Sequence, residues 1–272
     1  MATRSMLTEE DAILGDLRLF GVRPDTQYEP SNTRVDGAHV HSCYEIYVNL
    51  SGDISFFHES TVYDVKPLDV VVSRPGDVHY CIYHAPCRHA HYCVWFLGEA
   101  AEAFLARWDV KGRIRLSGEY AERLPTLLQR VIETDDDPFL RVAAFMELLS
   151  LLSGDGGQTR KSEALPPLLE KMIAYVDQHL NTVEGSVELA QAFFISKSTV
   201  NRLFQRHVGI TVSELILAKR LSLAEKLLRT DISVTDTCYR VGFSDCSRFI
   251  REFKKKFGVT PLKYKRELFS GG

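Results

Sequence analysis

SVELAQAFFISKSTVNRLFQRHVG, the stretch from Ser186 to Gly209, has the pattern of two short helices joined by a tight turn. Its apolar residues recur at helical spacing and predict a seam between the helices, made by Val187, Leu189, Ala190, Val200, Leu203 and Phe204. The opposite face of the second helix is polar and basic, with Lys197, Ser198, Asn201, Arg202, Gln205 and Arg206. Such a face suits the major groove of DNA, where Arg can bind guanine and Asn can bind adenine.

A second stretch, SVTDTCYRVGFSDCSRFIREFKKKFG from Ser233 to Gly258, repeats this pattern. Its expected buried residues are Val234, Val241, Phe243, Phe249 and Phe253, and its expected exposed residues are Ser247, Arg248, Arg251 and Lys254–Lys256. One such pair of helices could equally be a solvated surface of an ordinary bundle, because short helical hairpins are common. Two units in tandem, in a basic part of the chain, favour binding to double-stranded DNA.

Helix-capping residues surround these two stretches. Thr211-Val212-Ser213-Glu214 has the pattern of a capping box and predicts the start of a long helix. Ser233 and Ser244 are expected to cap shorter helices, and Thr260-Pro261 is expected to start the last one. From Pro167 onward we predict seven helices in about 105 residues, and such short connections indicate a compact bundle.

Charge is unevenly distributed along the chain, whose net charge is −3. Residues 168–272 contain 17 Lys and Arg against 11 Asp and Glu, a net charge of +6, whereas residues 1–167 contain 16 against 25, a net charge of −9. This asymmetry is expected when only one part of a protein meets a polyanion. Residues 153–165, SGDGGQTRKSEAL, are rich in Gly, Ser and charge and predict a flexible linker. We therefore expect domains at 1–152 and 166–272.

The composition also predicts the location of the protein. No run of 18 or more apolar residues occurs, and acidic residues interrupt the N-terminal segment, so neither a membrane span nor a signal peptide is predicted. We expect a cytoplasmic protein without a membrane partner. Its six cysteines, at 43, 81, 87, 93, 238 and 246, include no Cys-x-x-Cys pair, so free thiols are expected in a reducing compartment.

The first part of the chain is rich in strand-forming residues between positions 35 and 97. The expected strands are YEIYVNL, SGDISFFHES, TVYDVK, LDVVVSR and HAHYCVWFL, and their density predicts a small barrel or sandwich. Two apolar helices are expected at 118–134 and 138–152, the second capped by Asp137 and starting at Pro138. The fold class predicted for the chain is therefore α+β, with two domains.

HVHSCYEIYVNLSG, from His39 to Gly52, predicts a strand with one polar face. Successive strand residues point to opposite faces, so the odd-numbered residues His39, His41, Cys43, Glu45 and Tyr47 are expected to point together. Inward faces of strands are normally apolar, so a buried face of this composition would be unusual. SRPGDVHY adds a further histidine, His79, three residues after a Pro-Gly turn.

Several motifs between Ser186 and Arg266 occur together in a fixed order. They are Leu189-Ala190, Ser196 with Arg202 and Phe204, Gly209, RLSLAEKLL (Arg220–Leu228), VGFSD (Val241–Asp245) and FKKKFGVTPLKYKR (Phe253–Arg266). This run resembles the DNA-binding domain of AraC/XylS-type bacterial transcription regulators. The resemblance implies two helix-turn-helix units, joined rigidly by the long helix, that enter successive major grooves. Thr237-Cys238, in place of the usual Ile-Ala, and the bulky Phe193-Phe194 depart from the family pattern.

The resemblance also implies which residues contact DNA. The base contacts fall to Ser198, Asn201 and Arg202 in the first unit and to Cys246, Ser247 and Arg251 in the second, and Lys197, Arg206 and Arg248 complete the expected DNA-binding set.

GAHVHSCYEIYVNLSG followed by PGDVH is similar to the two motifs of the cupin barrel, which commonly forms the N-terminal sensor of AraC-type regulators. In metal-binding cupins the positions of His39, His41, Glu45 and His79 hold the ion, and this set suits Fe(II), Mn, Ni, Cu or Zn. The preferred interpretation is an effector-binding site made by these four residues and Tyr47, with no cofactor required. A structural, hydrogen-bonded cluster is the third alternative.

The resemblance implies a sequence-specific transcription regulator that is controlled by a small-molecule effector, a sugar or related metabolite, and is not an enzyme. Tyr44, Tyr47, Phe57 and Tyr80 would suit stacking on such an effector. The alternative is a metal-dependent cupin enzyme, such as an isomerase or dioxygenase, but it leaves the basic helical part unexplained. CRHAHYC (Cys87–Cys93) spans about 20 Å as a strand, too far for one ion, and predicts only a polar strand face.

Two protein partners are expected besides DNA and the effector. RNA polymerase is expected because the family regulates transcription, and activation is the expected outcome. A homodimer is expected through the apolar helices at 118–134 and 138–152, whose alternative role is simple packing onto the barrel.

Overall fold

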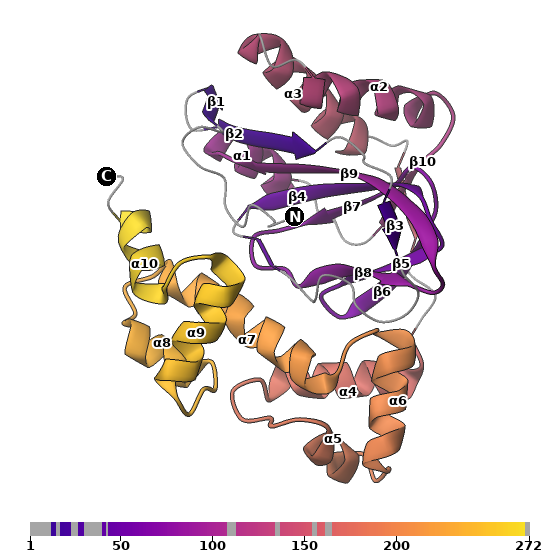
Figure 1. The fold of residues 1–272 in the computed structure, drawn as a ribbon. Coiled ribbons are helices and arrows are strands. Elements are labelled where there is room, and N and C mark those ends of the chain that lie inside the picture. Colours follow the sequence, from indigo (N-terminus) through magenta and orange to yellow (C-terminus); the bar gives the residue numbers. More distant parts are fainter. Residues whose placement is uncertain are drawn as a thin grey trace.

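The computed structural model describes residues 12–14, 17–22, 27–29, 40–41, 43–107, 113–133, 137–153, 157–160 and 165–269. Two sheets and three helices make up the N-terminal part, and helices alone make up the C-terminal part (Figure 1). Among the described residues, no helix is both long enough and apolar enough to span a membrane. The predicted α+β architecture is confirmed.

The strands form two sheets with antiparallel pairing. The larger sheet has the order β1 (Ala12–Leu14), β2 (Leu17–Val22), β9 (Cys87–Leu97), β4 (Tyr44–Ser51), β7 (Asp69–Ser73), β10 (Arg113–Leu116), β11 (Gly157–Arg160), and β3 (Gln27–Glu29) pairs with β9. The smaller sheet has the order β6 (Thr61–Val65), β5 (Ile54–His58), β8 (His79–Tyr83). The described strands therefore form a sandwich of two sheets, not one closed barrel. All five predicted strands are present, as β4, β5, β6, β7 and β9, whereas β8 was not predicted.

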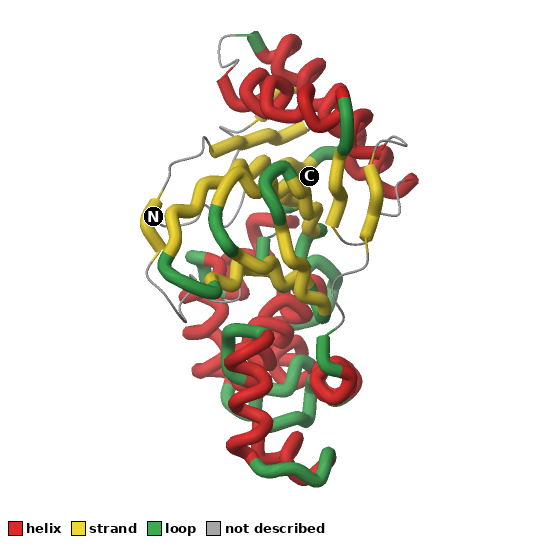
Figure 2. Tube along the Cα trace, turned by 90° about the vertical axis from the view of Figure 1, so that its right-hand side faces the viewer, coloured by secondary structure: helices red, strands yellow, loops and turns green. Residues whose placement is uncertain are grey.

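Side chains alternate along the strands and separate three layers of packing. On the outer face of the larger sheet, Ile46, Val72 and Phe96 pack with α2 (Glu119–Glu133) and α3 (Pro138–Ser153), the two predicted apolar helices. Between the sheets, residues of the opposite parity meet the small sheet, among them Cys43, Tyr47, Phe56, Tyr63 and Trp95. The outer face of the small sheet packs on the C-terminal helices. The layers are therefore, in order, helices α2 and α3, the large sheet, the small sheet and the C-terminal helices (Figures 1 and 2). A short helix, α1 (Glu99–Arg107), follows β9.

The seven predicted helices are all present in residues 165–269. They are α4 (Pro167–Gln178), α5 (Ser186–Ala192), α6 (Lys197–His207), α7 (Val212–Leu228), α8 (Val234–Arg240), α9 (Cys246–Phe257) and α10 (Pro261–Phe269). The capping box at Thr211 and Glu214 and the Ser233 cap form as predicted. The predicted Ser244 cap of α9 is wrong, because the next residue, Asp245, accepts from the backbone N–H groups of Ser247 and Arg248.

Part of the predicted flexible linker has regular structure. Residues 157–160 form β11, which pairs with β10 from Arg113–Arg160 to Leu116–Gly157. The sequence of β11, GQTR, lacks the β-branched and aromatic residues of a typical strand. Its strand conformation therefore follows from the unpaired edge of β10, which offers backbone donors and acceptors.

Candidate functional site

A buried polar cluster lies between the two sheets. Nε2 of His41 lies 2.9 Å from Oε2 of Glu45, and Nε2 of His79 lies 3.5 Å from the same oxygen. Trp95, which pairs with Glu45 across β4 and β9, donates its Nε1–H to this carboxylate. All four side chains are buried. The carboxylate therefore has three nitrogen neighbours at a position shielded from bulk water.

Two backbone contacts position the histidines of this cluster. The Gly76 N–H donates to the carbonyl of His41 over 2.8 Å, and Gly76 has a φ of +79°, a conformation that favours glycine. The Nδ1–H of His79 donates to the carbonyl of Asp77 over 2.8 Å, because a carbonyl can only accept. The ring of His79 is therefore held with Nε2 facing the carboxylate of Glu45.

The cluster has the composition and spacing of a metal site. One ligand atom each from His41, Glu45 and His79 can be chosen so that all lie within 4.8 Å of one another. Histidine ligands usually donate their other ring N–H to a carbonyl or carboxylate, as His79 does. Two imidazoles and a carboxylate suit a divalent transition metal with open coordination positions. These three residues fit such an ion, and His39, the fourth predicted ligand, lies outside the described residues.

Burial and mutual contact determine the charges in the cluster. Burial alone would raise the pKa of Glu45, but attraction to His79 and the hydrogen bond from His41 outweigh it and hold this pKa well below its usual value. Burial lowers the pKa of His41, and Glu45 opposes this effect only in part. A carboxylate beside a neutral imidazole offers negative charge and a nitrogen lone pair to a cation or to a ligand hydroxyl.

A second polar group lies in the same layer. Nε2 of His89 on β9 is 2.9 Å from the Tyr47 hydroxyl, and its Nδ1 is 2.8 Å from the Tyr83 hydroxyl. Burial and the neighbouring His91 lower the pKa of His89 to about 3, so the ring is neutral and can donate at one nitrogen and accept at the other. The polar face predicted for this strand is confirmed. The contact of His89 with Tyr47 was missed, because it joins side chains 42 positions apart that are not direct partners in the strand register.

Only one of the four aromatic residues expected to stack on an effector faces this layer. Tyr47 does so, whereas Tyr44 stacks on a phenylalanine of β9 in the core beneath α2 and α3. Phe57 and Tyr80 stack on each other, with centroids 4.8 Å apart, on the outer face of the small sheet. The expectation for these three residues was wrong, because neighbouring strand residues point to opposite faces.

The C-terminal helices form two helix-turn-helix units, α5–α6 and α8–α9. The second helix of each unit starts at a capped residue, Ser196 for α6 and Asp245 for α9. Most of the predicted DNA-binding residues are exposed on these two helices, namely Lys197, Ser198, Asn201, Arg202, Arg206, Ser247, Arg248 and Arg251. α7 separates the units, and its 17 residues span about 25 Å (Figure 1).

Three side chains of these units differ from expectation. Val187, predicted in the apolar seam, is 54% exposed, because Leu189 and Ala190 occupy the buried side of this short helix. Lys256, predicted to be exposed, is half-buried, and burial lowers its pKa to about 7. Cys246 is half-buried and forms a disulfide with Cys238, so the expectation of six free thiols was wrong. The remaining cysteines are free, namely Cys43, Cys81, Cys87 and Cys93.

A buried acid that was not predicted joins α7 to α10. Glu225 is fully buried, its Oε1 lies 2.7 Å from Nε of Arg229, and the hydroxyl of Tyr264 donates to the same oxygen. Burial alone would lower the pKa of Arg229, but Glu225 and Tyr264 outweigh it and raise this pKa. The spacing of Glu225 and Arg229, four residues apart on one helix, was the available signal.

The outer face of the small sheet packs directly on the helical part. The buried hydroxyl of Tyr80 on β8 donates to the carbonyl of Val208, the residue that ends α6, over 2.7 Å. Lys219 of α7 lies 2.8 Å from Asp177 of α4 and 3.5 Å from Glu59, in the turn between β5 and β6. Side chains of both parts share one hydrophobic core. The strands of the small sheet are therefore in direct contact with the C-terminal helices.

Comparison with known proteins gives the family. A model described as the AraC-like ligand binding domain matches residues 27–169, and a model described as a helix-turn-helix domain matches residues 189–267. Transcriptional activator RhrA from Rhizobium meliloti (strain 1021) is 31% identical over 61% of this chain and 57% of its own length. The uncharacterized HTH-type transcriptional regulator YijO from Escherichia coli (strain K12) is 28% identical over 75% of each chain. HTH-type transcriptional activator RhaS from Enterobacter sp. (strain 638) is 29% identical over 54% of each.

These matches cover about half to three quarters of the length of each relative. The relatives named here are transcription regulators, and both family models agree with the predicted class of protein. The ligand-binding model alone covers more than half of the 272 residues, and the helix-turn-helix model follows it in the predicted order. The chain belongs to the AraC family of transcription regulators, with an N-terminal ligand-binding domain and a C-terminal helix-turn-helix domain.

Proposed function

We propose that the chain binds specific DNA through α6 and α9, and that a small molecule at the polar cluster of His41, Glu45, Tyr47 and His79 changes this binding. The observation that carries the proposal is the structure of β8. His79 contacts the polar cluster on one face of this strand, and the next residue, Tyr80, contacts the end of α6 on the other. The sensing and DNA-binding elements are therefore one strand apart.

The exposed side chains of α6 and α9 support sequence-specific contacts. Arg202 and Arg251 can each bind guanine with two hydrogen bonds, and Asn201 can do the same with adenine. Lys197 and Arg206 suit the phosphates on either side. Because α7 holds the two helices apart, we propose that they occupy successive major grooves on one side of the duplex, about 10 bp apart.

Replacing Arg202 by alanine is expected to weaken binding to the best DNA site by about tenfold and to remove the preference for one base pair. The reason is the loss of a side chain that can bind a guanine edge with two hydrogen bonds. Selection of bound sequences from a randomised DNA pool gives the site, and anisotropy titrations of its single-base variants measure the preference.

Arg88→Ala is the matched control for this experiment. Arg88 is also exposed, but it lies on β9 of the sandwich, far along the chain from the DNA-facing helices. Its loss should leave affinity and preference unchanged. An Arg202→Ala protein that discriminates between bases as the parent does would contradict the proposed contact.

Tyr80→Phe is expected to lower the free energy of unfolding by about 1 to 3 kcal/mol, because the buried carbonyl of Val208 loses a donor. Burial keeps the pKa of Tyr80 well above its usual value, so the hydroxyl remains a donor at all physiological pH values. Urea denaturation measures the loss. Tyr239→Phe is the control, since Tyr239 is 58% exposed and its change should stay within about 0.5 kcal/mol of the parent. Equal effects of the two substitutions would contradict a specific role for Tyr80.

We propose a sugar or related metabolite as the effector class. The cluster pairs a carboxylate and imidazoles, which bind hydroxyl groups, with the ring of Tyr47, which suits an apolar sugar face. A divalent metal held by His41, Glu45 and His79 is a second proposed ligand of the same cluster. A thermal-shift screen of sugars and divalent metals on the full chain tests both, because ligands that bind only the native state raise its stability.

We propose that the protein contacts RNA polymerase, activates transcription and lies in the cytoplasm. We also propose that two copies form a homodimer through α2 and α3. Most apolar side chains of α2 and α3 pack on the larger sheet. Phe139, Leu140 and Met146 of α3 stay exposed, at 69%, 54% and 36%, and can form a contact with a second copy. Light scattering at micromolar concentration measures the mass, and a monomer would contradict the dimer.

A further inference from the structure

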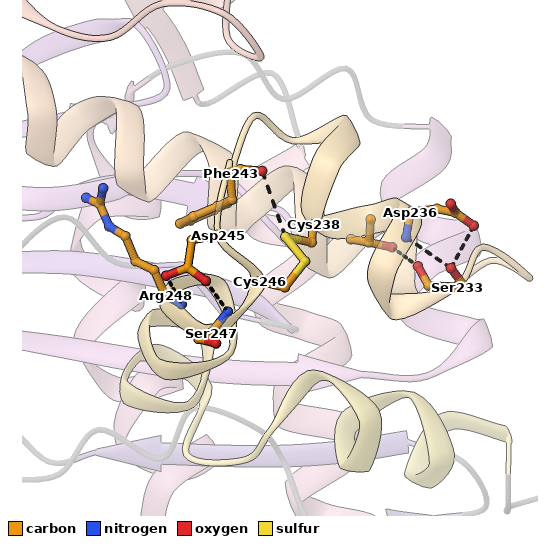
Figure 3. Close-up of a disulfide and its surroundings, with 9 residues drawn as sticks. Ser233, Asp236, Cys238, Phe243, Asp245, Cys246, Ser247 and Arg248 are labelled. Atoms are coloured by element: carbon orange, nitrogen blue, oxygen red, sulfur yellow. Dashed lines mark hydrogen bonds between the residues drawn. A yellow bond between two sulfur atoms is a disulfide. The ribbon is translucent and has the colours of Figure 1, made fainter.

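Two cysteines meet across the turn of the second helix-turn-helix unit. Cys238 on α8 is fully buried, and Cys246 is the first residue of α9. Their Cα atoms are 5.8 Å apart, and a disulfide joins them (Figure 3). Disulfides ordinarily join Cα atoms about 4.4 to 6.8 Å apart. The fold of the unit therefore places both thiols where the bond can form or break without movement of the backbone.

The unit has other means of holding its fold when the bond is absent. The rings of Phe243, Phe249 and Phe253 are buried in its core. The Asp245 cap of α9 uses side-chain and backbone atoms only, and Figure 3 shows it beside the disulfide. Sγ of Cys238 lies 3.9 Å from the carbonyl of Phe243, which can accept from the reduced thiol. Both the reduced and the oxidised states are therefore compatible with the same helices.

We propose that Cys238 and Cys246 form a reversible thiol–disulfide switch, closed by a hydroperoxide and opened by a dithiol, that weakens the binding of the second unit to DNA when closed. The inference rests on the proposed DNA binding. Among the described residues this is the one pair of cysteines that is bonded, and the other four cysteines are free.

The accessible member of the pair is Cys246. Its side chain is half-buried, whereas Cys238 is 0% exposed, so an oxidant reaches Cys246 first. Cys246 is the first residue of the 12-residue helix α9, where the Asp245 carboxylate already accepts from the backbone N–H groups of Ser247 and Arg248, so exposure decides which thiol reacts first. Cys246 is therefore the thiol that is oxidised first, and Cys238 is the resolving thiol.

The chemistry balances with one hydroperoxide. The Cys246 thiolate attacks a peroxide oxygen, so that an S–O bond forms, the O–O bond breaks and hydroxide leaves, which gives a sulfenic acid. The Cys238 thiol then attacks the Cys246 sulfur, the S–S bond forms, and the oxygen leaves as water with the thiol proton. A dithiol reverses the reaction by two thiol–disulfide exchanges and is itself oxidised to a disulfide.

Closure of the switch changes the DNA-facing side of α9. Ser247, Arg248 and Arg251 are exposed on this helix, and Cys246 precedes them at the end that would enter the groove. The disulfide holds the Cys246 sulfur against α8 and fixes the first turn of α9 to that helix (Figure 3). The side chain can then no longer meet a base, and α9 cannot adjust its angle to the groove. We expect the closed form to bind DNA at least fivefold more weakly.

The first test follows the bond itself and does not depend on DNA. The full chain is treated with dilute hydrogen peroxide or with dithiothreitol, its free thiols are alkylated, and it is digested with trypsin. Cleavage after Arg229, Arg240 and Arg248 puts the two cysteines on separate peptides, TDISVTDTCYR and VGFSDCSR. We expect these peptides to be linked after peroxide and separate after dithiothreitol. Two alkylated peptides after peroxide, or a link that dithiothreitol does not open, would overturn the switch.

The second test measures the affinity of the same two preparations for a DNA site that was selected with the reduced protein. We expect oxidation to weaken binding at least fivefold, dithiothreitol to restore it, and Cys246→Ser to abolish the response. Cys87→Ser is the control, because Cys87 is also half-buried but lies on β9 and should leave the response intact. Equal affinities of linked and reduced protein would overturn the switch, whereas a reduced protein without any DNA binding would overturn the proposed function instead.

Discussion

Replacing Glu225 by alanine is expected to lower the free energy of unfolding of the helical part by about 2 to 3 kcal/mol. Glu225 is fully buried and accepts hydrogen bonds from Arg229 and Tyr264. Its removal leaves the buried phenol of Tyr264 and the partly exposed guanidinium of Arg229 without the oxygen that they share. Because Tyr264 belongs to α10 and Glu225 to α7, the loss also loosens the last helix and the second DNA-binding unit.

Two signals separate this effect from a general loss of stability. Trp95 lies on β9 of the sandwich and the other tryptophan of the sequence, Trp108, also precedes the helical part, so fluorescence carries no tryptophan signal from that part. Far-ultraviolet circular dichroism follows mainly the helices, and most helical residues belong to α4–α10. We expect Glu225→Ala to lower the midpoint of the circular dichroism transition in urea more than that of the fluorescence transition.

Two further variants calibrate the result. Glu225→Gln keeps an oxygen that can accept, so its loss should be smaller. Glu170→Ala removes an exposed glutamate of α4 and should stay within about 0.5 kcal/mol of the parent. A Glu225→Ala protein as stable as the Glu170→Ala protein would contradict the role given to the buried acid.

The second large effect is expected at Glu45. Replacing it by alanine should lower the free energy of unfolding by about 3 kcal/mol, because His41, His79 and Trp95 lose the carboxylate that they share in the sandwich. It should also weaken the binding of a divalent metal at least 100-fold, since the cluster loses its anionic ligand. Titration calorimetry with zinc and nickel chlorides measures the second effect, and tryptophan fluorescence in urea the first.

Glu45→Gln separates the two effects. Its amide oxygen can still accept from Trp95, so most of the stability should remain, but the negative charge that attracts a cation is gone. Asp53→Asn removes the charge of an exposed carboxylate beside β5 and should change neither quantity. Metal binding by Glu45→Gln with the affinity of the parent would contradict the proposed ligand set, and a parent that binds neither metal would contradict the metal proposal altogether.

The parts of the structure that follow from local patterns could be predicted from the sequence. The helices after Pro167 were predicted because their caps and apolar spacing lie within a few residues of each other, as at Thr211 and Glu214. The inward face of Glu45 and Tyr47 was predicted because parity along a strand needs no information from elsewhere in the chain.

Features that depend on contacts between distant segments were missed. β11 forms only because β10 offers an edge, and the bonds from His89 to two tyrosines depend on how β9 lies against other strands. The contact of Tyr80 with Val208 joins residues 128 positions apart, and no pattern near either residue indicates it. The Cys238–Cys246 bond has the same origin, because eight residues of spacing bring two thiols together only after the turn has folded.

The length of α7 sets the spacing of α6 and α9 and, in the proposed complex, must match the dimensions of DNA. Each residue inserted into a helix lengthens it by about 1.5 Å and rotates everything beyond by about 100°. One insertion among the 17 residues of α7 would turn the exposed face of α9 more than a quarter of a circle away from that of α6. Seven inserted residues would return the exposed face of α9 close to its original direction. They would also lengthen α7 by about 10 Å, which corresponds to roughly three base pairs of duplex. With α6 and α9 in successive major grooves, as proposed, we expect deletions and insertions in α7 to be tolerated only where the periods of helix and duplex coincide.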